Sequence, residues 1–316
     1  MQEIWPLLQN SMVKHTGIRY KAYDPGWSKV FTRGTMDGRI KDVQLWETFP
    51  TPERRQPGMG FKAADLKPSF SKRYYRVYYG LSTLVAKEDW DSDQTGVLVK
   101  VIPTKAGELA QAHYTLMEQV CADWWRYIAF AAEGSNTPGM SDGRPLISNA
   151  HPASPNNTGT LMSNKLATPT DLSVLAYQQL ATMLRKQRAP NNNQIINNGP
   201  STLVIAPDLI YIGKQILQSQ WEPNTADRNT NYIPNDGVKL TTWPYWNVQG
   251  SSGAASGTVN GYVLLADDSS LNVYVGDDID VESQYQLGVR STLFVSTCSF
   301  AVGADDWRGV AAGQPT

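Results

Sequence analysis

The stretch that decides the fold is residues 104–132, which read TKAGELAQAHYTLMEQVCADWWRYIAFAA. The side chains of one helix face recur there at three- and four-residue steps: Leu109, His113, Leu116, Val120, Trp124 and Ile128. Pro103 precedes the helix, where a missing backbone N–H costs little, and Gly134 follows it as a stop. At about 1.5 Å per residue the helix is roughly 40 Å long. That length predicts a structural spine.

The region upstream predicts an arm and a hairpin. Residues 1–36 mix aromatic residues, Pro and Gly without a helical or strand period, which favours an extended arm that is buried on other surfaces. Residues 37–82 predict a long hairpin, because strand-forming residues gather at 39–49 and 69–79 around a tip rich in Pro and Gly. A protruding two-stranded ribbon is marginally stable alone, so we expect it to rest on a neighbour. An ordinary surface loop is the alternative.

The region downstream predicts a mixture of helices and strands. Thr168 is the expected N-cap of a second helix, with Pro169 at its first position and Leu175 on its apolar face. A strand at 202–206, a helix at 207–218, and strands at 238–246, 261–266, 271–275 and 281–302, the last one broken, are expected to follow. Helices and strands in this order, without regular alternation, indicate the α+β class.

Composition argues against several classes of protein. The formal net charge is −1 and charged residues make up 18% of the chain, whereas a nucleic-acid binder needs a basic surface to neutralise phosphates. Cys121 and Cys298 have no metal-like spacing, so we expect two buried thiols in a reducing compartment. The N-terminus lacks the pattern of a secretory signal, and no apolar run reaches the ~18 residues of a membrane span.

Motifs for catalysis, cofactors or metals are not found in the sequence. His15, His113 and His151 lack metal-ligand spacing, and His113 is expected to be a satisfied partner on its helix. A run of four acidic residues indicates a charged strand edge, with a Ca²⁺ site as the alternative: Asp277, Asp278, Asp280 and Glu282. We therefore expect no catalytic, cofactor-binding or metal-binding residues, and an enzyme with a non-local site remains the alternative.

Five short motifs carry a resemblance to a known family. They are residues 142–151 (DGRPLISNAH), 183–187 (MLRKQ), 203–207 (LVIAP), 262–267 (YVLLAD) and 306–309 (DWRG). In their order and spacing they resemble Mu-type major head subunits, which have the HK97-like capsid fold. Pro103 and residues 222–260 depart from that pattern. The resemblance implies an α+β, HK97-like major capsid protein of a tailed phage or prophage, with no enzymatic activity.

The resemblance also implies a domain organisation. It assigns 1–36 to an N-terminal arm and 37–82 to an E-loop. A P-domain comprises 83–195 together with 276–302, and its spine helix is about 104–132. An A-domain comprises 196–275, and the C-terminal tail 303–316 has no definite place. In this family the arm and E-loop embrace neighbouring subunits. Pentamers and hexamers would then form an icosahedral head around double-stranded DNA, in a virion assembled in the host bacterial cytoplasm.

Ten residues of the predicted hairpin are candidates for contacts between copies of the chain. Basic side chains would set the register and aromatic side chains would anchor the contact: Trp46, Arg54, Arg55, Lys62, Lys72, Arg73, Tyr74, Tyr75, Arg76 and Tyr79. Further expected partners are a portal, a separate scaffolding protein (an arm that begins at Met1 leaves no room for a cleaved scaffold), a decoration protein in some heads, and DNA held without sequence specificity. The alternatives are an encapsulin-like shell or another self-assembling virion component.

Overall fold

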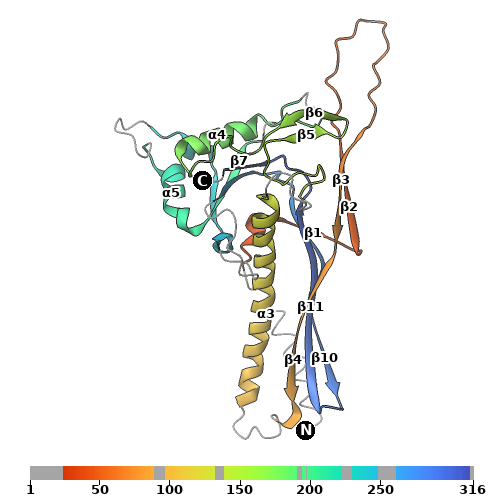
Figure 1. Ribbon diagram of the computed structural model, residues 1–316, viewed down its shortest axis with the longest axis vertical. Helices are drawn as coiled ribbons and strands as arrows, with labels where there is room; N and C mark the ends of the chain where they lie inside the picture. The colour runs from red at the N-terminus through yellow and green to blue at the C-terminus, as the bar shows by residue number, and fades with distance from the viewer. Residues whose placement is uncertain are drawn as a thin grey trace.

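The structure is a computed structural model that describes residues 24–88, 97–131, 139–190, 194–196, 198–221, 230–247 and 261–313, although not the side chains of 97–104 and 106. A long helix and a sheet form a pillar, a second sheet with two helices lies across one end of it, and a hairpin projects beyond that end (Figure 1). No helix within the described ranges is long and apolar enough to cross a membrane. The expectations for His15 and Gly134 fall outside the described residues.

The spine helix is confirmed, with different ends. It comprises α3, Val97–Trp124, and one π turn, Trp125–Ala129, in which the Phe130 N–H donates to the Trp125 carbonyl. It therefore begins seven residues before the expected position, because Pro103 removes one backbone donor without ending the helix. The expectation that it reaches residue 132 is wrong, since the wider π turn ends the regular ladder.

The sheet of the pillar has the strand order β1-β10-β11-β4. Its strands are β1 Thr32–Thr35, β4 Val77–Ala86, β10 Leu271–Gln286 and β11 Ser291–Ala304. Two strands were expected within 271–286, but β10 is continuous, because register shifts between Val275 and Asp280 absorb the irregularity. Beyond Val275 the parallel pairing with β1 stops, and the acidic run lies at this open edge, as expected.

The second sheet has the order β12-β9-β7-β8 and is covered by α4 and α5. Its elements are α4 Val174–Arg185, β7 Pro200–Ile205, α5 Ile210–Gln218, β8 Lys239–Thr242, β9 Tyr262–Ala266 and β12 Val310–Gly313, with short 3-10 turns at Pro207–Leu209, Ile233–Asp236 and Pro244–Asn247. Residues 310–313, in the expected tail, thus form a buried strand of this sheet. Likewise α4, within the expected P-domain boundaries, packs on this second sheet.

The start of α4 corrects the expected N-cap. Ser173 is the cap, and its Oγ accepts a hydrogen bond from the Ala176 N–H at 3.2 Å. Thr168 cannot be the cap, because the Thr170 carbonyl accepts from the Tyr262 hydroxyl at 2.9 Å and is not part of a helix. Leu175, expected on the apolar face, is exposed.

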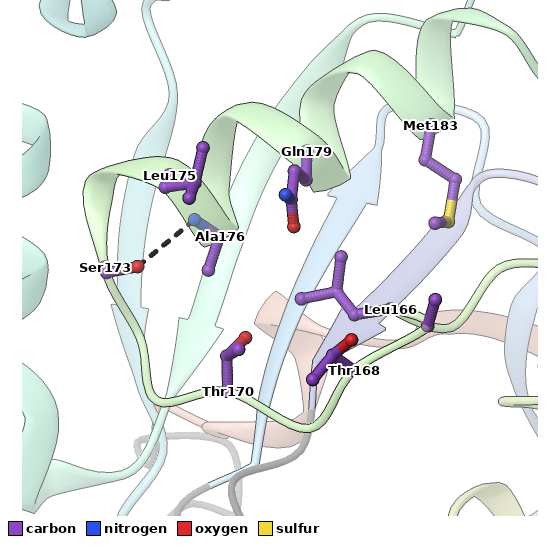
Figure 2. A pocket seen from close by; sticks show the side chains of 9 residues that line it. Leu166, Thr168, Thr170, Ser173, Leu175, Ala176, Gln179 and Met183 are labelled. Atoms are coloured by element: carbon purple, nitrogen blue, oxygen red, sulfur yellow. Dashed lines mark hydrogen bonds between the residues drawn. The ribbon is translucent and has the colours of Figure 1, made fainter.

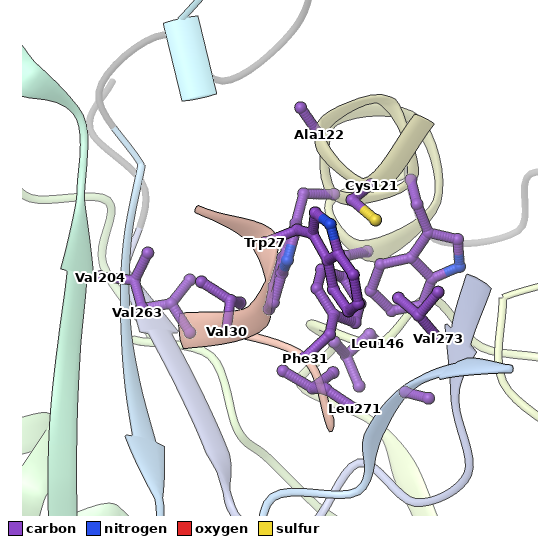
Figure 3. Close-up of a cluster of buried hydrophobic side chains, with 14 of the residues drawn as sticks. Trp27, Val30, Phe31, Cys121, Ala122, Leu146, Val204, Val263, Leu271 and Val273 are labelled. Atoms are coloured by element: carbon purple, nitrogen blue, oxygen red, sulfur yellow. The ribbon is translucent and has the colours of Figure 1, made fainter. Parts of the chain in front are cut away.

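The main core lies where the spine meets both sheets, and it corrects the expectation for the arm. Trp27 in the 3-10 turn Trp27–Lys29, Val30 and Phe31 are buried there, beside Cys121 and strands of both sheets (Figure 3). Phe31 is 2% exposed and meets Trp124, Trp125 and Trp243 edge-on. Residues 24–36 therefore belong to the body of their own subunit. The tryptophans that surround Phe31 are distant from it in the sequence.

Buried polar groups form hydrogen bonds within and beside this core. Glu118 on α3 accepts hydrogen bonds from the Trp27 N–H at 3.2 Å and from the Trp243 indole at 2.6 Å. His113 lies between Ser296 (2.8 Å) and Cys298 (3.3 Å), so it is the satisfied partner that was expected. Cys121 and Cys298 are buried thiols, also as expected, and burial raises the pKa of both.

Two of the sequence motifs meet in space. His151 begins β5 (His151–Ser154), which pairs with β6 (Asn157–Met162), and its ring stacks on Trp307 with centroids 4.6 Å apart. Its Nδ1 lies 2.6 Å from the Asp142 carboxylate and its Nε2 lies 3.0 Å from the Leu146 carbonyl. Arg308 donates to the Ala153 carbonyl at 2.9 Å. Residues 142–151 and 306–309 therefore join the loop after the spine to the end of the chain.

Candidate functional site: the outer face of the hairpin

The predicted hairpin is present as an antiparallel ribbon and not as an ordinary loop. It consists of β2, Ile40–Trp46, and β3, Pro68–Tyr75. Side chains along a strand alternate between its two faces. Lys72 and Tyr74 point to one face, here called the inner face, and Arg73 and Tyr75 point to the other, the outer face. This alternation divides the ten candidate residues.

The inner face packs on the body of the same subunit. Tyr74 is only 4% exposed, and its hydroxyl donates to Asp305 Oδ1 at 2.5 Å. The other oxygen of Asp305 accepts from the Tyr274 hydroxyl at 2.6 Å and from the Asn272 amide at 2.7 Å. Burial, with the Asp305 carboxylate nearby, raises the pKa of Tyr74 and Tyr274 far above that of a free tyrosine. Tyr74 is therefore a structural anchor of the ribbon.

Lys72 fixes the same face to two other segments. Its Nζ donates to the Gly139 carbonyl at 2.7 Å and to the Ala304 carbonyl at 3.2 Å. Burial lowers the pKa of Lys72 to about 8, against the attraction of Asp305 and Asp142. Lys72 thus holds the ribbon to the loop after the spine and to the end of β11.

The outer face carries two exposed apolar pairs on either side of an ion pair. Tyr75, 63% exposed, lies across from Ile40, and Trp46, 51% exposed, lies across from Pro68. Between them Arg73 binds the Asp42 carboxylate with two hydrogen bonds of 2.7 and 2.9 Å, which lowers the pKa of Asp42. Both partners are exposed, so this ion pair contributes only about 0–1 kcal/mol. The apolar pairs are what this face offers to a partner.

The tip of the hairpin is exposed along its whole length. Every residue from 48 to 67 is exposed, and this tip contains no helix or strand. Lys62 pairs with Glu53 at 2.5 Å, and the Arg55 guanidinium lies over the Phe61 ring, 4.3 Å from its centroid. Phe61 is 88% exposed. Sequence reasoning missed Phe61, although an aromatic residue in a Pro- and Gly-rich tip was the available signal.

The last two candidates lie where the ribbon joins the pillar. Arg76 forms an ion pair with Asp277 and donates to the Ser299 hydroxyl at 2.7 Å. Tyr79 stacks on Phe300 with ring centroids 4.9 Å apart. The structure thus engages Lys72, Tyr74, Arg76 and Tyr79 within their own subunit. It leaves Trp46, Arg54, Arg55, Lys62, Arg73 and Tyr75 on exposed faces of the hairpin.

The acidic, histidine and cysteine side chains in the described part of the chain are not gathered at a metal site. No group of three or more His, Cys, Asp or Glu residues there is arranged to hold a metal ion. His113 and His151 are both buried and engaged with neighbouring side chains or carbonyls. Exposed apolar side chains, by contrast, lie along the outer face and the tip of the hairpin.

Comparison with known proteins gives the following matches. A sequence profile described as phage capsid protein matches residues 72–313. A chain of Mycobacterium phage Adephagia shares the fold at a TM-score of 0.54 and 14% identity, covering 93% of this chain and 91% of that one. A chain of the cyanophage P-SCSP1u capsid gives 0.55 and 11%, covering 92% and 88%. A chain of the capsid of an empty GTA particle gives 0.55 and 7%, covering 92% and 90%. No curated protein sequence matches.

Proposed function

Because the chain belongs to the phage capsid protein family and forms the shell of a viral head, we propose that the outer face of its hairpin is a surface by which neighbouring subunits hold one another. The fold is the HK97-like capsid fold. Proteins of this family are structural components of the virion and not enzymes. The work of the chain is therefore self-association, and the hairpin is the element best shaped for it.

One observation carries the proposal: the same ribbon is fixed to its own body on one face and presents apolar side chains to water on the other. Burying roughly 100 Å² more of Trp46 or of Tyr75 stabilises a contact by about 2.5 kcal/mol per ring. A ribbon that is already held at its inner face loses little conformational entropy on docking. The entropic cost therefore offsets less of the free energy gained by burying the rings.

The arrangement in the shell follows from the proposal. Residues 37–76, with the β2–β3 ribbon and its tip, act as the E-loop. The expected boundary at residue 82 is too late, because residues 77–86 form β4 of the pillar, and the pillar built on α3 with the β1-β10-β11-β4 sheet acts as the P-domain. The second sheet with α4 and α5 acts as the A-domain, around the axes of pentamers and hexamers. Contacts between unlike surfaces of copies of one chain close into rings. Such rings would assemble into an icosahedral head around double-stranded DNA, in the host bacterial cytoplasm.

The remaining partners are proposed on family resemblance alone. They are a separate scaffolding protein during assembly, a portal at one vertex, and packaged DNA held without sequence-specific contacts. A net charge of −1 suits a wall that lies beside DNA without gripping it. Some heads of this type also carry a decoration protein.

A double substitution on the outer face tests the proposal. The variant Trp46→Ser/Tyr75→Ser removes both exposed rings, and Ser71→Ala on the same face is the matched control without a ring to lose. Sedimentation velocity and electron microscopy should show shells for the wild type and the control, and only unassembled subunits for the double variant. Thermal unfolding of the subunits should be unchanged in all three. A double variant that forms shells as readily as the wild type would refute the proposal.

A further inference from the structure

The pillar has a groove between the spine and the sheet that is open among the residues the structure describes. This spine groove is lined by Val77, Tyr79, Asp123, Trp124, Tyr127 and Phe300, among others, and has a volume of about 380 Å³. A cavity of about 150 Å³ is enough to hold a benzene ring. Tyr79 and Phe300 stack within it, while Val77 and Tyr127 are exposed at its rim. The groove therefore has room for an aromatic side chain from outside.

The groove also carries one carboxylate and no cation among its described lining residues. Asp123 Oδ1 lies 3.1 Å from Arg126, whose guanidinium is otherwise bonded to the carbonyls of Tyr245 and Trp246. Within the described residues no donor reaches Oδ2 of Asp123. Burial raises the pKa of Asp123, as expected for a carboxylate that is incompletely paired. An incoming cation would relieve that cost.

Three other hollows in the described part of the chain do not offer this combination. The groove between β6 and α4, about 440 Å³, is lined by Lys186 and Arg188, which would repel a cation. The groove along α4, about 470 Å³, is lined by uncharged residues such as Leu166, Gln179 and Met183 (Figure 2). The hollow at Trp246 holds only about 10 Å³, too little for a ring.

The hairpin tip carries the complementary group. Arg55 and Phe61 are already stacked, so a cation and an aromatic ring are presented together and lose little freedom on binding. The hairpin directs its tip away from the spine of its own subunit (Figure 1), so the tip and the groove of one copy do not meet. A second copy is the occupant that both surfaces fit.

We propose that the Arg55–Phe61 pair of one subunit enters the spine groove of a neighbouring copy. The Phe61 ring lies against Tyr79 and Phe300, and the Arg55 guanidinium binds the free oxygen of Asp123. This inference rests on the proposed function, because it names the receiving site for the hairpin. It also places Tyr79 on the receiving side of the contact.

Cross-linking between two differently tagged subunits tests the inference. Shells are assembled from a mixture of Phe61→Cys and Tyr127→Cys subunits and oxidised. We expect a disulfide-linked heterodimer in shells and none in unassembled subunits. Matched controls replace Tyr127→Cys with Lys186→Cys in the basic groove or with Glu282→Cys on the acidic edge of β10. The native Cys121 and Cys298 are buried. Equal linkage to either control, or none to Tyr127→Cys, would overturn the inference.

A pair of charge variants covers the case in which the cysteine mixture forms no shells. Arg55→Glu should raise the protein concentration needed for assembly at least tenfold, whereas Arg55→Lys should change it less than threefold. An unchanged threshold for Arg55→Glu would contradict the inference. If Trp46→Ser/Tyr75→Ser abolishes assembly while Phe61 links elsewhere, only the receiving site is wrong. If that double variant assembles normally, the proposed function itself fails.

Discussion

Tyr74 and Tyr75 are adjacent in the chain and lie in opposite environments. The ring of Tyr74 is enclosed by its own subunit, where its hydroxyl bonds to Asp305. The ring of Tyr75 is exposed beside Ile40 on the other face of the ribbon. The contrast teaches that the hairpin is not a free arm. Its inner face is part of the body, and only its outer face and tip are left for a partner.

Substitution of the two tyrosines gives the largest expected difference. Tyr74→Ala should lower the free energy of unfolding of the subunit by about 3–5 kcal/mol, because a buried ring and a hydrogen bond to Asp305 are lost. Tyr75→Ala should change it by less than about 0.5 kcal/mol. Urea unfolding of unassembled subunits measures both. Equal destabilisation of the two variants would contradict the assignment of Tyr74 to the body and of Tyr75 to the exposed face.

For association between subunits we expect the opposite ranking, with a larger effect at Tyr75 than at Tyr74. Tyr75→Ala or Trp46→Ala should weaken each inter-subunit contact by about 2 kcal/mol, the typical effect of losing an aromatic anchor. Light scattering against protein concentration measures the assembly threshold. Tyr74→Phe, which keeps the buried ring, is the control and should assemble at nearly the wild-type threshold. A higher threshold for Tyr74→Phe than for Tyr75→Ala would contradict the assignment of the faces.

A smaller effect, dependent on pH, is expected at Lys72. Its pKa is about 8 in the folded subunit, whereas the ordinary value for a lysine side chain is 10.5, so between these values the unfolded chain binds more protons. Stability contributed at this site therefore rises with pH above about 8, by at most about 1.4 kcal/mol per pH unit. The free energy of unfolding of the wild type minus that of Lys72→Met, measured at pH 7, 8 and 9, should become more positive as the pH rises. A pH-independent difference would argue against a buried, charged Lys72.

The smallest effect is expected at the ion pair of the outer face. Asp42→Asn removes the charge that binds Arg73, and both side chains are exposed. Subunit stability should fall by less than about 1 kcal/mol, and the loss should shrink in high salt, because exposed ion pairs are screened. Unfolding at low and high salt measures this. A loss as large as that of Tyr74→Ala would mean that the outer face also stabilises the body.

The sequence was sufficient for the elements whose signals are local. Helical periodicity predicted the spine, and strand-forming residues on either side of a Pro- and Gly-rich tip predicted the ribbon. Positions fixed by distant contacts could not be predicted in this way. Phe31 is buried because Trp124, Trp125 and Trp243 form its pocket, and Thr168 loses the cap of α4 to Ser173 because Tyr262 engages the segment between them.

The candidate contact residues were also predicted from local features of the sequence. Their contacts with residues distant in the sequence could therefore not be predicted. A cluster from Lys72 to Arg76 was selected for its charge and aromatic content. Strand alternation predicts that alternate members of such a cluster face opposite ways. Which face meets the body depends on Asp305 and on the Gly139 and Ala304 carbonyls, which are remote in sequence. Only the structure brings these groups together.

Hydrogen exchange of the backbone amides in residues 40–75, compared between unassembled subunits and assembled shells, tests the central claim most directly. We expect tip amides between residues 48 and 67 to exchange at nearly unprotected rates in subunits and to slow by at least ~100-fold in shells. Amides around Tyr74 should already be protected in the subunit. Tip amides that exchange equally fast before and after assembly would contradict the claim that the hairpin is completed by a neighbouring copy.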